Sequence, residues 1–239
     1  MLQLLWGKHS ETDRLESRSL YLTHQEFQQY LEGNIPQNVI VPEELFTLEN
    51  RTGIAIEKRR KAVETGKLYA VEFVRVNRNV GFAVRLNIDS ELADTGLLRL
   101  GGEAKTAYYF AERLPLLSDE NIRPKVAESK IFRLVLVTPA VFEKGWLPDG
   151  LDTDGRGEVG DCVVQLLGAA IPRYHIIGGW DIMQSKPKES LRAVPSSSVY
   201  FFKLLDGDVN SLFDQVFGKS ICQKDAWKKQ GLGITYIGG

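Results

Sequence analysis

The chain has 239 residues, of which 43% are hydrophobic and 26% are charged, and its formal net charge is −1. A chain of this size can bury the core of one large or two small domains. The near-neutral charge argues against a stand-alone nucleic-acid-binding protein, although one local basic patch stays compatible with it. The two cysteines lie far apart, and no apolar run is long enough to span a membrane. We therefore expect a protein of the reducing cytoplasm without a metal, a cofactor or a membrane segment.

The first predicted elements are a helix and a β-hairpin. Residues 23–31 are amphipathic, and Thr23 followed by Glu26 is typical of a capping box. Residues 68–76 and 81–88 are rich in β-branched and aromatic side chains, and Asn77-Arg78-Asn79 separates them. This pattern predicts two antiparallel strands joined by a turn.

A basic run, Lys58-Arg59-Arg60-Lys61, precedes the predicted hairpin. Such a run is compatible with an ordinary solvated surface and with a patch that binds phosphate groups, and both interpretations stay open. Arg78 in the predicted turn adds to the same basic region.

The stretch 90–98 fits a short helix that the pair Gly101-Gly102 ends, and a strand is predicted over 106–110. The glycine pair has two readings. It can be a helix C-cap, or a bare backbone turn that faces phosphate together with Lys105. Strand, strand, helix and strand in this order make most of a ferredoxin-like unit.

The second half repeats this outline. We expect a connection over 115–129 and a loop over 149–160, whose acidic residues do not meet the spacing of a calcium loop. Strands are predicted over 130–137, 162–171, 197–205 and 234–237, and a helix over 209–217. We therefore predict an α+β fold with two ferredoxin-like units, residues 1–125 and residues 126–239.

Several side chains of the second half are candidates for function. Trp180 follows two glycines, where it could stack on a base or anchor the core. Lys186 and Lys188 make a basic loop, and a further glycine cluster closes the chain. His175 could act as a general base in RNA cleavage, with a packed or edge-strand histidine as the alternative.

An ordered series of short motifs resembles one protein family. The motifs are residues 51–56 (RTGIAI), 66–69 (GKLY), 71–73 (VEF), 98–103 (LRLGGE), 138–142 (TPAVF), 145–146 (GW), 178–181 (GGWD), 193–195 (AVP), 198–202 (SVYFF) and 231–234 (GLGI). In this order they are similar to the third subunit of the CRISPR type III-B (Cmr) effector complex, a member of the RAMP superfamily. The resemblance runs from about Arg51 to the C-terminus.

The resemblance implies two ferredoxin-like (RRM-like) units and a non-catalytic role in antiviral defence. It implies that the protein binds the 5′ tag of the CRISPR RNA and docks on the large polymerase-like subunit and on backbone RAMP subunits, and that it meets target RNA only indirectly. The residues predicted to bind RNA are Lys58, Arg59, Arg60, Arg78, Gly101, Gly102, Lys105, Trp180, Lys186, Lys188, Gly231 and Gly233.

Two departures from the family pattern bear on this expectation. Nothing before residue 36 resembles the family's N-terminal strand and proline-rich segment, so we expect the first unit to be incomplete or completed by a partner. The basic residue after Gly-Gly-Glu is Lys105, which gives charge without the bidentate fork of arginine.

Two alternatives stay open. The first is a repeat-specific RNA endonuclease of the same superfamily that uses His175. The second is a scaffold protein that touches no RNA.

Overall fold

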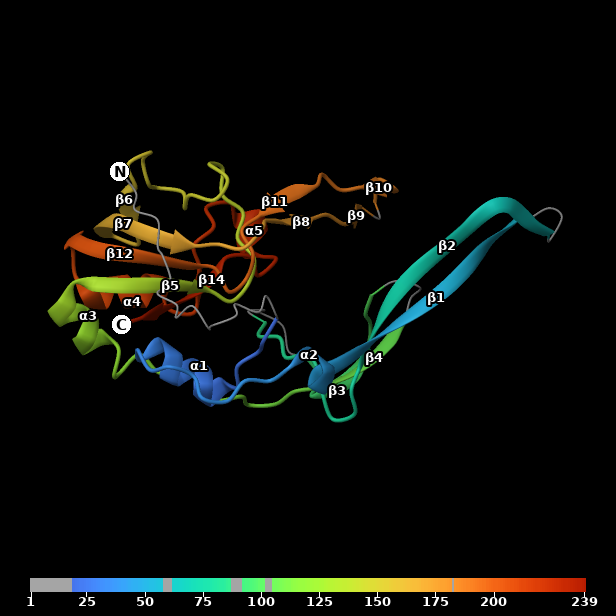
Figure 1. The fold of residues 1–239 in the computed structure, drawn as a ribbon, viewed down its shortest axis with the longest axis horizontal. Helices are drawn as coiled ribbons and strands as arrows, with labels where there is room; N and C mark the ends of the chain where they lie inside the picture. Colours follow the sequence, from blue (N-terminus) through green and yellow to red (C-terminus); the bar gives the residue numbers. More distant parts are fainter. Residues whose placement is uncertain (1–18, 58–61, 87–91, 102–104, 182) are drawn as a thin grey trace, which may run out of the picture. The chain divides into compact units, whose positions relative to one another are not determined.

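The computed structural model describes residues 19–57, 62–86, 92–101, 105–181 and 183–239 (Figure 1). The described chain divides into two compact units. Residues 22–38 and 118–239 form one, here called the C-terminal unit, and residues 19–21 and 39–117 form the other, here called the ribbon unit. Both strands and helices occur, and the paired strands are antiparallel, so the predicted α+β class is confirmed.

A six-stranded antiparallel sheet is the centre of the C-terminal unit. Its strands are β5 (Ile131–Leu136), β6 (Arg156–Val159), β7 (Cys162–Ala170), β12 (Val199–Asp206), β13 (Lys219–Ser220) and β14 (Ile234–Gly238), in the order β13-β14-β5-β12-β7-β6. Phe202 of β12 pairs with Phe132 and Leu166 on its two sides, and all three side chains are buried. The strands predicted over 130–137, 162–171, 197–205 and 234–237 are therefore confirmed.

Helix α4 (Val209–Val216) connects β12 to the β13–β14 end of the sheet and confirms the helix predicted there. It begins at Asp208, whose carboxylate accepts a hydrogen bond from the Ser211 N–H at 3.1 Å. Its apolar stripe is buried, and the helix contacts both β7 and β14. The connection from β5 to β7, all of whose residues are described, contains no helix.

Two further helices depart from the sequence expectation. Helix α3 (Arg123–Ser129) lies where a plain connection was expected. Pro124 does not prevent it, because a proline is compatible with the first turn of a helix. Helix α1 (His24–Leu31) begins as predicted, since the Thr23 hydroxyl accepts from the Glu26 N–H at 3.1 Å. The prediction of a capping box is wrong, because the Glu26 carboxylate accepts hydrogen bonds from the N–H groups of Gln37 and Asn38 and not from the start of the helix.

Helix α1 packs within the C-terminal unit. The rings of Phe27 and Tyr236 meet edge to face at 5.9 Å, and the Gly239 N–H donates to the Leu31 carbonyl at 3.0 Å. The unit therefore includes residues that lie far before the expected boundary at 125 and 126, and the division into 1–125 and 126–239 stays a prediction.

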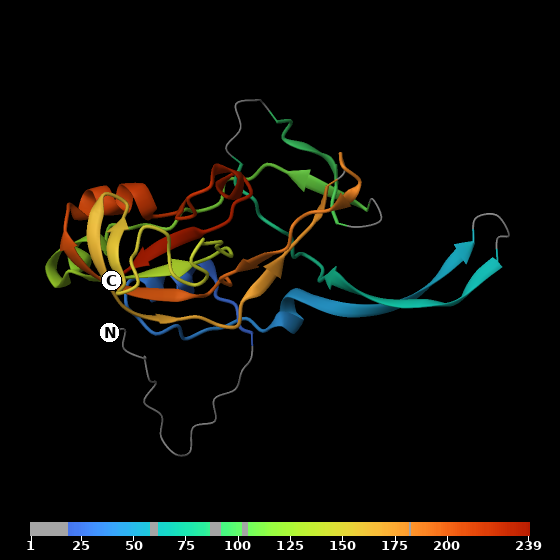
Figure 2. The ribbon, with the colours of Figure 1, turned by 90° about the horizontal axis from the view of Figure 1, so that it is seen from above.

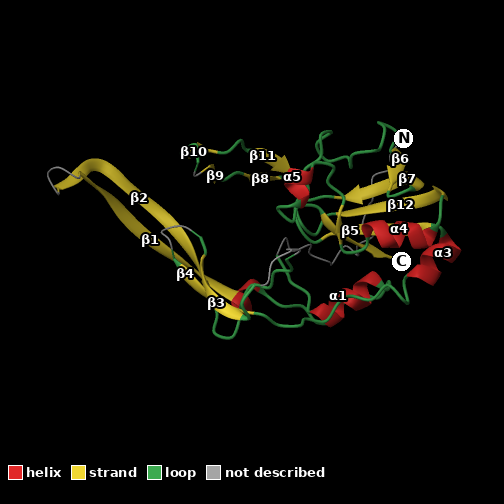
Figure 3. Ribbon diagram, turned by 180° about the vertical axis from the view of Figure 1, so that it is seen from behind, coloured by secondary structure: helices red, strands yellow, loops and turns green. Residues whose placement is uncertain are grey.

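The ribbon unit consists of two antiparallel ribbons (Figure 3). Helix α2 (Pro42–Leu45) leads into β1 (Phe46–Glu57), which pairs with β2 (Ala62–Val76), and β3 (Thr95–Arg99) pairs with β4 (Thr106–Phe110). The prediction that residues 68–76 pair with 81–88 is wrong. Residues 68–76 belong to β2 and pair with β1, which precedes them in the chain, and residues 81–86 form no strand. The helix predicted over 90–98 is also wrong, because the described residues 92–98 contain no helix and 95–98 belong to β3, whereas the strand over 106–110 is confirmed.

A long hairpin leaves the central sheet of the C-terminal unit (Figures 1 and 2). It comprises residues 173–193 and is here called the arm. Near the sheet, β8 (His175–Ile177) pairs with β11 (Leu191–Ala193), and farther out β9 (Trp180–Asp181) pairs with β10 (Lys186–Pro187). None of the helices in the described part of the chain has the length and apolar character that crossing a membrane requires.

Candidate nucleic-acid interface

The arm brings together three residues that the sequence predicted as RNA contacts. Trp180 pairs with Pro187, Lys186 pairs with Asp181, and the Lys188 N–H donates to the Gly179 carbonyl at 2.9 Å. The Trp180 side chain is 57% exposed, so the alternative that it anchors the core is wrong. The exposed indole therefore lies on the same short ribbon as two exposed lysines, and the register places Trp180 with Pro187 on one face and Lys186 with Asp181 on the other.

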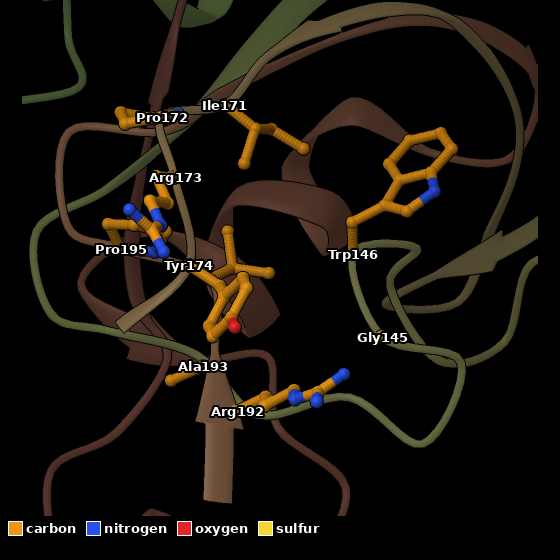
Figure 4. A pocket seen from close by; sticks show the side chains of 10 residues that line it. Gly145, Trp146, Ile171, Pro172, Arg173, Tyr174, Arg192, Ala193 and Pro195 are labelled. Carbon is orange, nitrogen blue, oxygen red and sulfur yellow. The ribbon is translucent and has the colours of Figure 1, made fainter. Parts of the chain in front are cut away.

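A cavity lies at the base of the arm (Figure 4). Its volume is about 380 Å³, and its lining combines Trp146 with Tyr174 and Arg192 of the arm. Trp146 and Tyr174 lie on different sides of the cavity and are 44% and 45% exposed. The Arg192 guanidinium carbon lies 5.3 Å from the centroid of the Tyr174 ring, which is a cation–π contact.

The loop that carries Trp146 is tied to the core by one buried hydroxyl. Tyr200 of β12 is fully buried, and its hydroxyl donates to the Trp146 carbonyl at 2.6 Å. Burial raises the pKa of Tyr200, so this hydroxyl stays a donor at any physiological pH. The cavity wall thus rests on the central sheet.

The ribbon unit carries a second group of cations. Arg51 and Arg75 stand on the paired strands β1 and β2, and both hold the carboxylate of Glu49. The hydrogen bond from Arg75, followed by the smaller effect of Arg51, lowers the pKa of Glu49. Both Arg51 and Lys105 also lie over the Phe73 ring, at 4.9 and 3.7 Å from its centroid. Lys105 therefore contacts an aromatic face, and its side chain remains exposed.

Comparison with known proteins identifies the family of this chain. The model of the CRISPR-associated protein family Cas_Cmr3 matches residues 6–239. The chain belongs to the Cas_Cmr3 family. The predicted resemblance is thereby confirmed, and it extends farther toward the N-terminus than the expected start near Arg51, because the match begins at residue 6.

Two solved structures contain chains with a partial likeness to this Cas_Cmr3 protein. One is a Type III-B Cmr-beta bound to cognate target RNA and AMPPnP, at 18% identity and a TM-score of 0.44, covering 66% of this chain and 47% of that one. The other is a Type III-B Cmr-beta bound to cognate target RNA, at 17% identity and 0.42, covering 67% and 46%. The chain thus spans about half the length of the solved chains that it matches. No curated protein matches.

The glycines predicted to contact RNA differ from one another in this Cas_Cmr3 chain. Gly101 has φ +77° and free space around its Cβ position, and it lies in the β3–β4 turn, which the hydrogen bond from Leu100 N–H to the Lys105 carbonyl closes at 2.9 Å. The helix-cap reading is therefore wrong. The N–H groups of Gly231 and Gly233 donate to the carbonyls of Lys228 and Pro139, so neither backbone N–H is free for a phosphate.

Other predicted positions are placed more simply. Arg78 is exposed in the turn that follows β2. Gly102 and the basic positions Lys58, Arg59 and Arg60 lie outside the described residues.

His175 lies on β8, opposite Ala193, with an exposed side chain. Within the described part of the chain, the structure gives its imidazole no hydrogen bond or ion pair that would orient it as a base. The same residues contain no cluster of three or more His, Cys, Asp or Glu side chains that could hold a metal ion.

The acidic loop over 149–160 uses its central carboxylate for its own backbone. The Asp152 carboxylate accepts from the N–H groups of Asp154 and Arg156 at 2.9 Å each. The end of the predicted loop is strand β6, which pairs with β7.

Sequence reasoning missed the cavity. Trp146, Tyr174 and Arg192 are distant in sequence, and only the pairing of β8 with β11 and the Tyr200 hydrogen bond bring them together. The one signal that the sequence offers for this cavity is Gly145-Trp146, an aromatic residue directly after a glycine.

Proposed function

We propose that this Cas_Cmr3 protein is a non-catalytic, cytoplasmic subunit of a type III-B CRISPR ribonucleoprotein effector complex that serves antiviral defence. It binds the 5′ tag of the CRISPR RNA, docks on the large polymerase-like subunit and on backbone RAMP subunits, and meets target RNA only indirectly. The family match over residues 6–239 supports the assignment to a CRISPR system. The observation that carries the RNA role is the exposed Trp180 on the same hairpin as the exposed Lys186 and Lys188.

The chemistry of the arm suits single-stranded RNA. A flat indole surface offers a stacking platform to any unpaired base, because every base has a π-face. Lys186 of the paired strand and Lys188, which follows that strand, add positive charge to the same hairpin on the face opposite Trp180, and this charge attracts RNA phosphates. The combination favours stacking and electrostatic attraction over the reading of base edges.

The topology of the C-terminal unit supports a ferredoxin-like origin. Strands β14, β5, β12 and β7 are neighbours in this order, and α4 connects β12 to the far side of β5. This is the order of a split β-α-β unit in which a loop replaces the first helix. We assign the ribbon unit to a second such unit that is incomplete by itself.

Exposed apolar side chains support docking on protein partners. Leu97 on β3 lies opposite Tyr108 on β4, and Phe110 follows on the same face of the ribbon. These neighbouring side chains are 72%, 64% and 62% exposed, and contiguous exposed apolar side chains are typical of protein–protein interaction sites. Burial against other subunits of the complex also agrees with the near-neutral net charge.

A charge and stacking variant of the arm tests the RNA role. In the reconstituted complex, the variant W180A/K186Q/K188Q should weaken binding of the CRISPR RNA. It should also reduce the slope of log K against log salt by about 0.7 for each phosphate contact that is lost. The matched control is K228Q/K229Q, which removes two exposed lysines from the region of helix α5 (Asp225–Lys228). Equal affinity and equal salt slope in both variants would favour the scaffold that touches no RNA.

The runner-up function is the endonuclease, and a direct assay separates it from the binding role. The purified protein is incubated with repeat RNA in the absence of divalent metal. We expect no cleavage. Cleavage that disappears in His175→Ala and persists in the arm variant would overturn the non-catalytic assignment.

A further inference from the structure

We propose that the cavity at the base of the arm holds one unstacked nucleobase of the bound RNA, with its phosphate at Arg192. This inference rests on the proposed RNA-binding function and deepens it, because it names the part of the ligand that the cavity takes.

The lining matches the two halves of a nucleotide. Its ten residues include two aromatic side chains and two arginines but no acidic residue. An apolar, aromatic surface complements a flat base, whereas arginine at the rim complements a phosphate. A volume of about 380 Å³ lies at the small end of the range for ligand sites and suits one base with its ribose.

The aromatic groups are available to a ligand. Trp146 and Tyr174 are each nearly half exposed, so part of each ring surface is open to a ligand. Arg192 already lies over the Tyr174 ring at 5.3 Å, which holds the guanidinium at the edge of the cavity. A base stacked on the other face of the tyrosine ring would therefore have a cation close to it.

The floor of the cavity is rigid. Ala193 and Val194 are buried, and Val194 exchanges two backbone hydrogen bonds with Ala140 at 2.9 and 2.8 Å. The Tyr200 hydroxyl fixes the Trp146 backbone from below. A preformed site of this kind loses little entropy when it binds a base.

The arm links the cavity to the predicted RNA contacts. Arg173 and Arg192 lie at its base, and Lys186 and Lys188 lie farther out on the same hairpin. A single strand that follows these cations reaches both Trp180 and the cavity. The ligand favoured here is therefore a nucleotide unit of single-stranded RNA rather than an apolar peptide, which would have no use for the arginines.

The experiment uses the reconstituted complex and CRISPR RNAs that carry 2-aminopurine at one 5′-tag position at a time. One position should be quenched in the native complex and should regain fluorescence in Trp146→Ala and Tyr174→Ala. RNA affinity should fall roughly 5- to 150-fold in these variants, the range for loss of a stacked base. Tyr174→Phe keeps the ring and should behave as the native protein.

Ile171→Trp is a second variant, because it fills the cavity and removes no wall. It should release the same base. The inference is overturned if no tag position responds to any of these variants, or if they block incorporation of the subunit and leave RNA affinity unchanged, since the cavity would then hold a protein partner. The arm variant W180A/K186Q/K188Q distinguishes the two failures. If it weakens RNA binding while the cavity variants do nothing, only the cavity inference fails, and if it too has no effect, the proposed RNA role fails.

Discussion

Substitution of two glycines in the last turn separates backbone strain from steric clash. Gly231 and Gly233 have nearly the same φ, +72° and +75°, so an alanine at either position pays the same left-handed strain of about 1–2 kcal/mol. Their surroundings differ. A Cβ at Gly231 would meet nothing within 4 Å, whereas one at Gly233 would lie 2.6 Å from the sulfur of Cys222 and 3.1 Å from its backbone nitrogen.

The clash at Gly233 sets the expected difference. Cys222 is buried, with 2% of its surface exposed, so its sulfur cannot move aside without disturbing the core. Overpacking of this kind costs about 1–3 kcal/mol. The free energy of unfolding should therefore fall by about 2–5 kcal/mol in Gly233→Ala and by about 1–2 kcal/mol in Gly231→Ala.

Urea unfolding of the full chain, followed by tryptophan fluorescence, measures both values, and equal m-values permit their comparison. The double variant Gly233→Ala/Cys222→Ala should lose less stability than the sum of its two single variants, because the smaller side chain relieves the clash. Equal destabilisation by the two glycine variants, with no coupling to Cys222, would refute this reasoning.

Three further predictions concern the core and the acidic loop. Tyr200→Phe should lower the free energy of unfolding by about 1 kcal/mol, because the Trp146 carbonyl loses its donor, and an unchanged urea midpoint would contradict this. Asp152→Ala should cost about 1–2 kcal/mol, whereas Asp152→Asn, which keeps one acceptor oxygen, should cost less in the same titration. Burial raises the pKa of the Cys162 and Cys222 thiols, so the stability they contribute is present below the unfolded thiol pKa of about 8.5 and is lost as the pH rises. Unfolding measured from pH 7 to pH 10 should show a steeper loss in the native chain than in the double alanine variant.

The C-terminal unit could be predicted in large part from its sequence. Helix α4 has a capping aspartate and an apolar stripe at helical spacing, and β5 and β12 are mainly apolar strands that Arg133 and Lys203 interrupt only once each within their runs. These local signals agree with the final packing, so the elements could be recognised without knowledge of their neighbours.

The ribbon unit was harder because its strands are exposed. Strand β1 carries Thr47, Glu49 and Asn50 among its apolar residues, which weakens the alternation that identifies a strand. Strand β3 is a short apolar run, and periodicity alone does not tell such a run from a helix. Its pairing with β4 decides the structure, and a pairing between segments is not encoded in either one alone.

The candidate site was predicted in composition more than in arrangement. Trp180, Lys186 and Lys188 were recognised one by one, and only the pairing of β9 with β10 shows that they share one ribbon. The roles of the glycine N–H groups depended on hydrogen bonds that a sequence does not reveal. Gly231 permits a turn with positive φ, and Gly233 also permits close packing against Cys222. The N–H groups of both glycines donate hydrogen bonds within the fold.

The most direct test of the RNA role is photo-crosslinking in the native effector complex, with mass spectrometry of the peptides attached to the RNA. The account predicts crosslinks from 5′-tag nucleotides to arm residues, with Trp180 among them, and their loss in W180A/K186Q/K188Q but not in K228Q/K229Q. A complex that carries its CRISPR RNA and yields no crosslink to residues 173–193 would contradict it.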